Sequence, residues 1–214
     1  MEHLNFYSLS NKNLYELAEF VVTENFNHHE SYSDTDQFKA EVEDIYYEEK
    51  NFKKSKIFVS RDHEGKINGS IRVFKWNHKD VLPLEKLFHI NPSSFIKNKT
   101  TNIWHIGRFA IKKGIDKTGF GIFKTLMAYA INEVCCHKNA VAIAECDAKL
   151  LKVLKLMGIE AITLAEPIHY LGSETIPVML TYNGLKKFLD KNYHLMSTQE
   201  VSALHQSVVL QQTA

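Results

Sequence analysis

Apolar residues recur at helical spacing in two segments near the start of the chain. They are Asn13 to Phe26 and Asp36 to Lys50, and the polar stretch NHHESYSD lies between them. Apolar positions three and four residues apart form one face of a helix, and polar clusters between such segments mark loops. The pattern therefore predicts that two helices open the fold.

Strict alternation then replaces the helical spacing. The segment Ser55 to Trp76 contains two alternating runs around Asp62, Glu64 and Gly65, which is typical of a β-hairpin. A connection punctuated by prolines follows, with room for one helical turn, and leads to a third strand at Asn102 to Ile111. Two antiparallel strands and a third strand therefore follow the opening helices.

The longest helix is expected from Phe120 to Val134, before a short apolar strand at Ala140 to Cys146. One stripe along this helix is apolar, and its members are Phe123, Leu126, Met127, Ala130, Ile131 and Val134. A further helix at 147–158 is stopped by Gly158. Two strands around Gly172 and a helix at 184–195 complete the predicted elements.

This order of elements predicts an α/β (α+β) fold with a mixed central β-sheet flanked by helices on both faces. We expect one domain over residues 1–194 and a polar C-terminal tail over 195–214, which is rich in Ser, Gln and Thr from Ser197 onward. The 214 residues, 44% of them hydrophobic, can form one full core.

Charge and cysteine content narrow the class of protein. Lys and Arg total 26 against 25 Asp and Glu, so no basic field favours nucleic acid. No apolar run approaches the roughly 20 residues of a membrane span, and the N-terminus lacks a signal-peptide pattern. Three cysteines, two of them adjacent, suit free thiols in a reducing compartment. We expect a cytoplasmic protein without a transmembrane segment.

The start of the longest helix is the first candidate binding site. Gly119, Phe120 and Gly121 open it, directly after a strand and a turn. Backbone N–H groups at a helix N-terminus attract anions, and glycines let a phosphate or a phosphopantetheine arm come close. We therefore expect these three residues to bind the phosphate-bearing part of a co-substrate.

The element order, this Gly-Phe-Gly opening and the spacing from Asp147 to Gly158 resemble the GNAT acyltransferase superfamily. Asp116 and Leu154 stand where its acetyltransferases usually carry Arg or Gln and a general-acid Tyr. The stretch WHIGRFAI looks like the Trp-Glu-x-Ser-Arg-Phe strand of acyl-homoserine lactone synthases and N-acyl amino acid synthases. GSIRVF, LPLEKLF and EPIHYLGSETIPVML extend the likeness over residues 40–190, with His105 and Gly107 in place of the families' Glu and Ser.

The resemblance implies transfer of a fatty acyl group from an acyl carrier protein, or from acyl coenzyme A, to the amine of an amino acid or derivative. An amine attacks a thioester only when unprotonated, so a base must take its proton. His105 occupies the position of the families' carboxylate, and imidazole suits proton transfer at neutral pH. We take His105 as the first candidate base, with Glu145 in reserve and a structural histidine as the alternative.

Arg108 is the second catalytic candidate, because a buried guanidinium requires a carboxylate partner or a substrate. An internal ion pair with Glu43, Asp44 or Glu145 is the alternative. Arg72 and Trp76 share one face of their strand, which forms an amphipathic wall that suits a carboxylate beside an acyl chain. A surface arginine over aromatic rings is the other reading. The predicted substrate-binding residues are Arg72, Trp76, Trp104 and Phe109.

Other clusters favour ordinary structural roles. NHHE and CCH lack ligand spacing for a metal, so we expect no metal site and no permanently bound cofactor. Cys146 lacks a visible activating base, which favours a core cysteine over a nucleophile. Two alternatives to the fatty N-acyltransferase remain: an acetyl-coenzyme A-dependent N-acetyltransferase acting on small molecules, and an inactive acyl-binding or interaction protein of the same fold.

Overall fold

The computed structural model describes residues 5–29, 35–96, 98, 100–115, 119–170 and 173–196. Within these residues, eight strands form one mixed sheet in the order β1-β2-β3-β4-β5-β8-β6, and β7 also pairs with β8. The strands are β1 (Asn5–Ser8), β2 (Lys56–Arg61), β3 (Ile67–Lys75), β4 (Asn102–Ile111), β5 (Ala140–Asp147), β6 (Ala161–Thr163), β7 (Ile168–Tyr170) and β8 (Ser173–Leu180).

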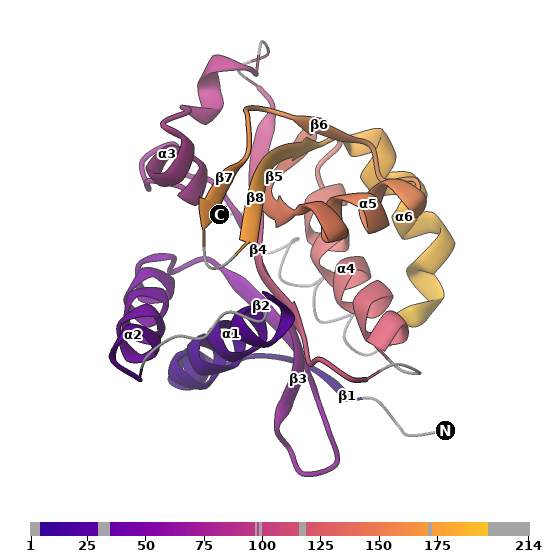
Figure 1. Ribbon diagram of the computed structural model, residues 1–214. Coiled ribbons are helices and arrows are strands. Elements are labelled where there is room, and N and C mark those ends of the chain that lie inside the picture. Colours follow the sequence, from indigo (N-terminus) through magenta and orange to yellow (C-terminus); the bar gives the residue numbers. More distant parts are fainter. Residues whose placement is uncertain are drawn as a thin grey trace.

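Helices cover both faces of this sheet (Figure 1). On one face lie α1 (Leu14–His29) and α2 (Thr35–Asn51), and on the other lie α4 (Gly119–Cys135) and α6 (Tyr182–Asn192). The remaining helices are α3 (Pro83–Phe88), α5 (Ala148–Leu156) and the short 3₁₀ turns η1 (Asn11–Asn13), η2 (Pro92–Ser94) and η3 (Tyr193–Leu195). The expected α/β fold with a mixed, doubly covered sheet is confirmed.

Apolar residues of α4 form the centre of the larger core. Leu126, Ala130, Ile131 and Val134 are fully buried against the sheet, as the predicted stripe requires. The smaller core on the opposite face packs Leu17 and Val22 of α1 with neighbouring strand residues. Buried apolar area on both faces fixes the sheet between the two helical layers.

Strands β4 and β5 run parallel and then separate, which creates the space for a site. They pair from Asn102 opposite Ala140 to His105 opposite Ile143, and no farther. Beyond Ile143, β5 pairs with β8 on its other side, as far as Asp147 opposite Thr175. The second halves of β4 and β5 therefore border an opening in the sheet.

A β-bulge distorts β4 at this opening. Ser70 pairs with Ala110 and Arg72 pairs with Gly107, so Arg108 and Phe109 lie opposite the single residue Ile71. Arg108 adopts a φ of 51°, in the left-handed region that non-glycine residues rarely occupy. The bulge turns the Arg108 side chain away from regular strand geometry and toward the opening.

Some predicted elements differ from the observed ones. β1 was not expected, since its four residues are too few to show alternation. The segment predicted as one strand before Gly172 forms the two short strands β6 and β7. Asp116, Gly172 and the tail from Ser197 lie outside the described residues. No described helix combines the length and the apolar character that crossing a membrane would require.

Candidate active site

A cavity of about 200 Å³ lies where β4 and β5 separate. One part of its lining is charged or polar, with Glu48, Arg72, Lys86, His105, Arg108, Glu145 and Tyr170. Another part is apolar, with Ile106, Met127, Ala144, Cys146, Leu150, Leu154 and Leu180. The cavity thus joins a polar end and an apolar end, as substrates with a polar head and an apolar tail require.

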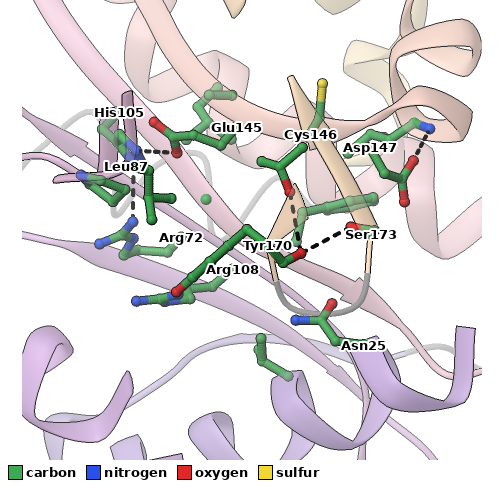
Figure 2. A pocket seen from close by; sticks show the side chains of 18 of the residues that line it. Asn25, Arg72, Leu87, His105, Arg108, Glu145, Cys146, Asp147, Tyr170 and Ser173 are labelled. Carbon is green, nitrogen blue, oxygen red and sulfur yellow. Dashed lines mark hydrogen bonds and ion pairs between the residues drawn. The ribbon is translucent and has the colours of Figure 1, made fainter. Parts of the chain in front are cut away.

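Three side chains form a buried hydrogen-bonded chain at the polar end (Figure 2). Nη2 of Arg72 lies 3.0 Å from Nδ1 of His105, and Nε2 of His105 lies 2.9 Å from Oε2 of Glu145. A guanidinium can only donate, so Nδ1 of His105 accepts and Nε2 carries the hydrogen donated to Glu145. The chain therefore fixes the neutral imidazole tautomer and the orientation of the Glu145 carboxylate.

The second oxygen of Glu145, Oε1, is buried and has no hydrogen-bond partner. The side chain of Glu145 is 10% exposed and borders the cavity. A buried carboxylate oxygen without a partner costs free energy unless a ligand or water satisfies it. Glu145 therefore borders the cavity with one carboxylate oxygen to which no described residue donates.

His105 lies at the centre of the hydrogen-bonded chain, but neither of its ring nitrogens is free to act as a base. It is fully buried, and Phe74 stacks on its ring at a centroid distance of 5.4 Å. Both ring nitrogens have hydrogen-bond partners, so accepting a proton at Nδ1 requires loss of the Arg72 contact. This geometry favours a positioning role for His105 and makes Glu145 the stronger candidate for the base.

Arg108 has two acidic partners, and both come from the end of α2. Its Nε donates to Oε1 of Glu49 at 2.8 Å, and its Nη2 donates to Oε2 of Glu48. Glu49 also pairs with Arg72, at 3.2 Å from Nη1. Burial lowers the pKa of Arg108, but Glu49 and Glu48 outweigh this effect and raise the pKa above its ordinary value. An internal ion pair, the alternative considered from the sequence, is therefore present. Its acids are Glu48 and Glu49 rather than Glu43, Asp44 or Glu145.

Arg72 is enclosed rather than exposed over a surface. It is 1% exposed, and its guanidinium carbon lies 4.9 Å from the Phe52 ring centroid and 4.8 Å from that of Phe74. Complete burial lowers the pKa of Arg72, whereas the neighbouring Glu49 raises it. Two aromatic rings and one carboxylate thus hold a cation deep in the site.

The absence of a side chain at Gly107 makes room for this arrangement. A Cβ atom there would lie 2.8 Å from Nη2 of Arg72 and 2.9 Å from Cε1 of His105. Such distances are shorter than van der Waals contact, so any other residue would displace one of the two side chains. His105 and Gly107 stand where the acyl-homoserine lactone synthases and N-acyl amino acid synthases that the chain resembles carry Glu and Ser. These two replacements are therefore spatially linked.

Cys146 lines the cavity but does not suit nucleophilic attack. Burial raises the pKa of its thiol to about 12, with Asp147 and Glu145 adding to the shift. The thiolate is the reactive form of cysteine. Cys146 therefore remains a thiol near neutral pH, as the expected core cysteine does.

The other predicted binding residues divide into two groups. Phe109 lines the cavity and meets Phe123 edge-to-face at a centroid distance of 5.0 Å. Trp76 instead packs near α3 and donates its indole N–H to the Asp80 carbonyl at 2.8 Å. Trp104 lies in the larger core beside His137. The geometry does not support the expectation that Trp76 and Trp104 bind the substrate, since neither borders the cavity.

Gly119, Phe120 and Gly121 begin α4, outside the cavity lining. Phe120 is 55% exposed, and a Cβ built on Gly121 meets no atom within 4 Å. Phe120 stacks with Phe123 at 6.0 Å between ring centroids, and Phe123 contacts Phe109 at the cavity wall. Aromatic rings thus connect the cavity with the start of α4.

Sequence reasoning missed Glu48, Glu49, Lys86 and Tyr170. A signal was present for one of them, because Val42, Ile45 and Glu49 form the buried stripe of α2. An acid at an apolar position of a helix implies a buried cation as partner. Tyr170 borders the cavity from β7, and burial raises the pKa of its hydroxyl although Arg108 opposes this shift.

No protein-family model matches the sequence, and no curated protein matches it. Several solved structures are similar in fold. TofI, crystallised with an inhibitor and MTA, is 15% identical with a TM-score of 0.60, over 92% of this chain and 100% of that chain. FeeM, an N-acyl amino acid synthase from uncultured soil microbes, is 14% identical with a TM-score of 0.57, over 87% of this chain and 95% of that chain.

The AHL synthase LasI is 12% identical with a TM-score of 0.58, over 90% of this chain and 97% of that chain. Other matching structures are GNAT proteins. At such low identity the likeness establishes the fold. The chain has the GNAT fold, in the form that TofI, FeeM and LasI share, and the expected fold is thereby confirmed.

Proposed function

We propose that the protein is a cytoplasmic N-acyltransferase. It moves a fatty acyl group from an acyl carrier protein or acyl coenzyme A thioester to the amine of an amino acid or derivative. The observation that carries this proposal is Oε1 of Glu145, which is buried at the cavity without a partner. The thioester acts as a co-substrate, so no permanently bound cofactor takes part.

The residues at the polar end suit attack of an amine on a thioester. The amine arrives as an ammonium ion, and the Glu145 carboxylate accepts its proton. The neutral nitrogen then forms a bond to the thioester carbon and the C–S bond breaks. The second proton that the nitrogen loses on becoming an amide goes to the departing thiolate, which leaves as a thiol. Arg72, through His105, keeps the Glu145 carboxylate oriented for the first step.

The apolar end of the cavity favours a fatty acyl group over an acetyl group. Met127 of α4, Leu150 and Leu154 of α5 and Leu180 of β8 border it together. Leu154 stands where GNAT acetyltransferases often carry a Tyr. In this chain it extends the apolar part of the cavity lining instead. Each buried methylene contributes roughly 0.8 kcal/mol, so an acyl chain gains binding free energy in proportion to its length.

The start of α4 is our candidate for the phosphate-bearing part of the donor. The N–H of Gly119 already donates to the Ile115 carbonyl at 2.7 Å, so the next N–H groups of the first turn are the ones that would bind a phosphate. A Cβ built on Gly121 meets no atom within 4 Å, which leaves space beside this residue. The rings of Phe109, Phe123 and Phe120 offer an apolar path between that end and the cavity. A phosphopantetheine arm would follow this path to bring its thioester to Glu145.

Mass spectrometry of lipid extracts tests the proposal. Cells expressing the wild-type chain should accumulate an N-acyl amine that is absent from cells expressing Arg108→Lys at equal level. Lysine carries the charge but cannot bond Glu48 and Glu49 at once as the planar guanidinium does. Purified protein that releases no thiol from long-chain or acetyl donors with any amine would refute the proposal.

A further inference from the structure

Resting on the proposed function, we infer that the acceptor is an amine without a free carboxylate, such as an amino acid amide or ester or a simple amine. The resemblance to acyl-homoserine lactone synthases and N-acyl amino acid synthases is compatible with either an amino acid or an amino acid derivative as the acceptor. The charges around the cavity distinguish between them, because a carboxylate needs a cation and an ammonium ion needs an anion.

Every cation that borders the cavity already has a carboxylate partner. Lys86 pairs with Glu48 at 2.6 Å, and Arg108 pairs with both Glu48 and Glu49. Arg72 pairs with Glu49 at 3.2 Å. The side chain of Glu49 is fully buried and the side chain of Glu48 is 17% exposed. Nε and Nη1 of Arg72 are buried without a hydrogen-bond partner, but the rings of Phe52 and Phe74 enclose this guanidinium. Each described cation of the cavity lining is therefore already paired with an acid of the protein.

A substrate carboxylate would have to displace one of these acids. Displacing Glu49 would leave a buried carboxylate without its two arginine partners, and loss of one partner from a buried ion pair is strongly unfavourable. Arg72 is also closed off by the rings of Phe52 and Phe74. The cost of rearrangement therefore opposes a second carboxylate at the polar end.

Among the carboxylates that border the cavity, Glu145 differs from Glu48 because it forms no ion pair with any described lysine or arginine. Glu145 has the neutral His105 as its hydrogen-bond partner, and its Oε1 has none. The three cations named above pair with Glu48 and Glu49, and Asp147 caps α5 by accepting from the Leu150 N–H at 2.6 Å. An ammonium group therefore gains a carboxylate partner in Glu145, whereas the carboxylate of a zwitterionic amino acid would meet only cations that already pair with an acid.

Matched pairs of acceptors test this inference. Leucine is compared with leucinamide and tyrosine with tyramine, each with dodecanoyl and hexadecanoyl thioesters of coenzyme A and of an acyl carrier protein. Released thiol and N-acyl product are both measured. The member of each pair without a carboxylate should have a kcat/KM at least about tenfold higher. Amidation lowers the basicity of the amine, whereas decarboxylation raises it. A preference that both pairs share therefore reports the absence of the carboxylate charge and not a change in amine basicity.

A substitution in the ion-pair network sharpens the test. Glu48→Gln frees Lys86 and one edge of Arg108, so it should shift the ratio toward leucine and tyrosine by about tenfold. Glu43→Gln makes the same change in charge on an exposed position of α2 outside the cavity, and should leave the ratio as in the wild type. If Glu48→Gln does not fold, the wild-type ratio alone decides.

The outcomes separate this inference from the proposed function. Equal or better use of leucine and tyrosine by the wild type would overturn the inference while leaving N-acyl transfer in place. Thiol release with none of the amines, from any donor, would overturn both. A wild-type preference for leucinamide and tyramine, reduced in Glu48→Gln and unchanged in Glu43→Gln, is the expected result.

Discussion

Nε2 of His105 lies 2.9 Å from Oε2 of Glu145, across the point at which β4 and β5 cease to pair. This bond joins the two strands that border the cavity, and it holds one oxygen of a carboxylate that lines the cavity while the other oxygen is buried without a partner. The proposed acyltransferase chemistry depends on this division of the two oxygens.

Substitution of His105 distinguishes positioning from proton transfer. His105→Ala should lower kcat/KM by about 10- to 100-fold, the range for groups that orient a reacting residue. His105→Gln can still accept from Arg72 and donate to Glu145, so we expect it to stay within about tenfold of the wild type. Rates of acyl transfer measured across pH should keep the wild-type profile in His105→Gln. A lost ionisation in that variant would return the role of base to His105.

The spatial link between Gly107 and His105 predicts non-additive substitutions. Gly107→Ser should destabilise the fold by about 1–3 kcal/mol, because its Cβ would lie 2.8 Å from Nη2 of Arg72 and 2.9 Å from Cε1 of His105. Adding His105→Glu should recover part of this loss, since it removes one of the two clashes. Chemical denaturation of both single variants and the double variant measures the coupling. Strictly additive changes in unfolding free energy would refute the link.

Gly121 tests the donor site at the start of α4. Gly121→Val should raise the Kd for an acyl donor by about tenfold, because branched methyl groups would cover the accessible backbone N–H groups. The protein should stay folded, as a Cβ there meets no atom within 4 Å. Gly121→Ala adds a single methyl group and should weaken binding less. Calorimetric titration provides the affinities, and unchanged binding in Gly121→Val would exclude this donor site.

Acid sensitivity should follow from the network around Glu48. Burial alone raises the pKa of this carboxyl, but Arg108, Lys86 and Arg72 outweigh burial and hold the pKa below its usual value of 4.5. A pKa that is lower in the folded state stabilises the fold above pH 4.5, and this contribution is lost as the pH falls through the folded value. The wild type should therefore exceed Glu48→Gln in Tm at neutral pH.

That difference in Tm should shrink as the pH is lowered below 4.5, where Glu48 becomes protonated in the wild type. Glu43→Gln controls for the loss of one carboxylate from α2, and its Tm should follow the wild type at each pH. Thermal unfolding across this range is the measurement. A constant gap between wild type and Glu48→Gln down to low pH would contradict the ion-pair account.

Much of the fold follows from the sequence pattern. The apolar stripe from Phe123 to Val134 predicts α4, and the alternation from Ser55 to Trp76 predicts β2 and β3. The strand expected after the proline-punctuated connection is β4. Short edge elements carry too few residues for a period to show, so β1 was missed and β6 and β7 were merged. Pairing partners within a sheet depend on tertiary contacts that a local pattern does not contain.

The candidate site was predicted in part. Motif likeness pointed to Arg72, His105 and Arg108, and Glu145 was expected on the adjoining strand as the reserve base. The structure brings all four to one cavity. The partners of the arginines were missed, because Glu48 and Glu49 lie about 60 residues before Arg108 along the chain, and no local pattern links Glu49 with Arg72. The assignment of His105 as base depended on which of its nitrogens is free, and hydrogen bonds between distant strands determine this property.

Acyl transfer by Glu145→Gln tests the central claim most directly. Glutamine preserves the size of the side chain and the bond to His105 but cannot accept a proton, so loss of about 100-fold or more in kcat is expected at wild-type Tm. The assay follows thiol release and the N-acyl product with hexadecanoyl thioester and leucinamide. Glu145→Gln that forms this product as fast as the wild type, at equal stability, would contradict the account.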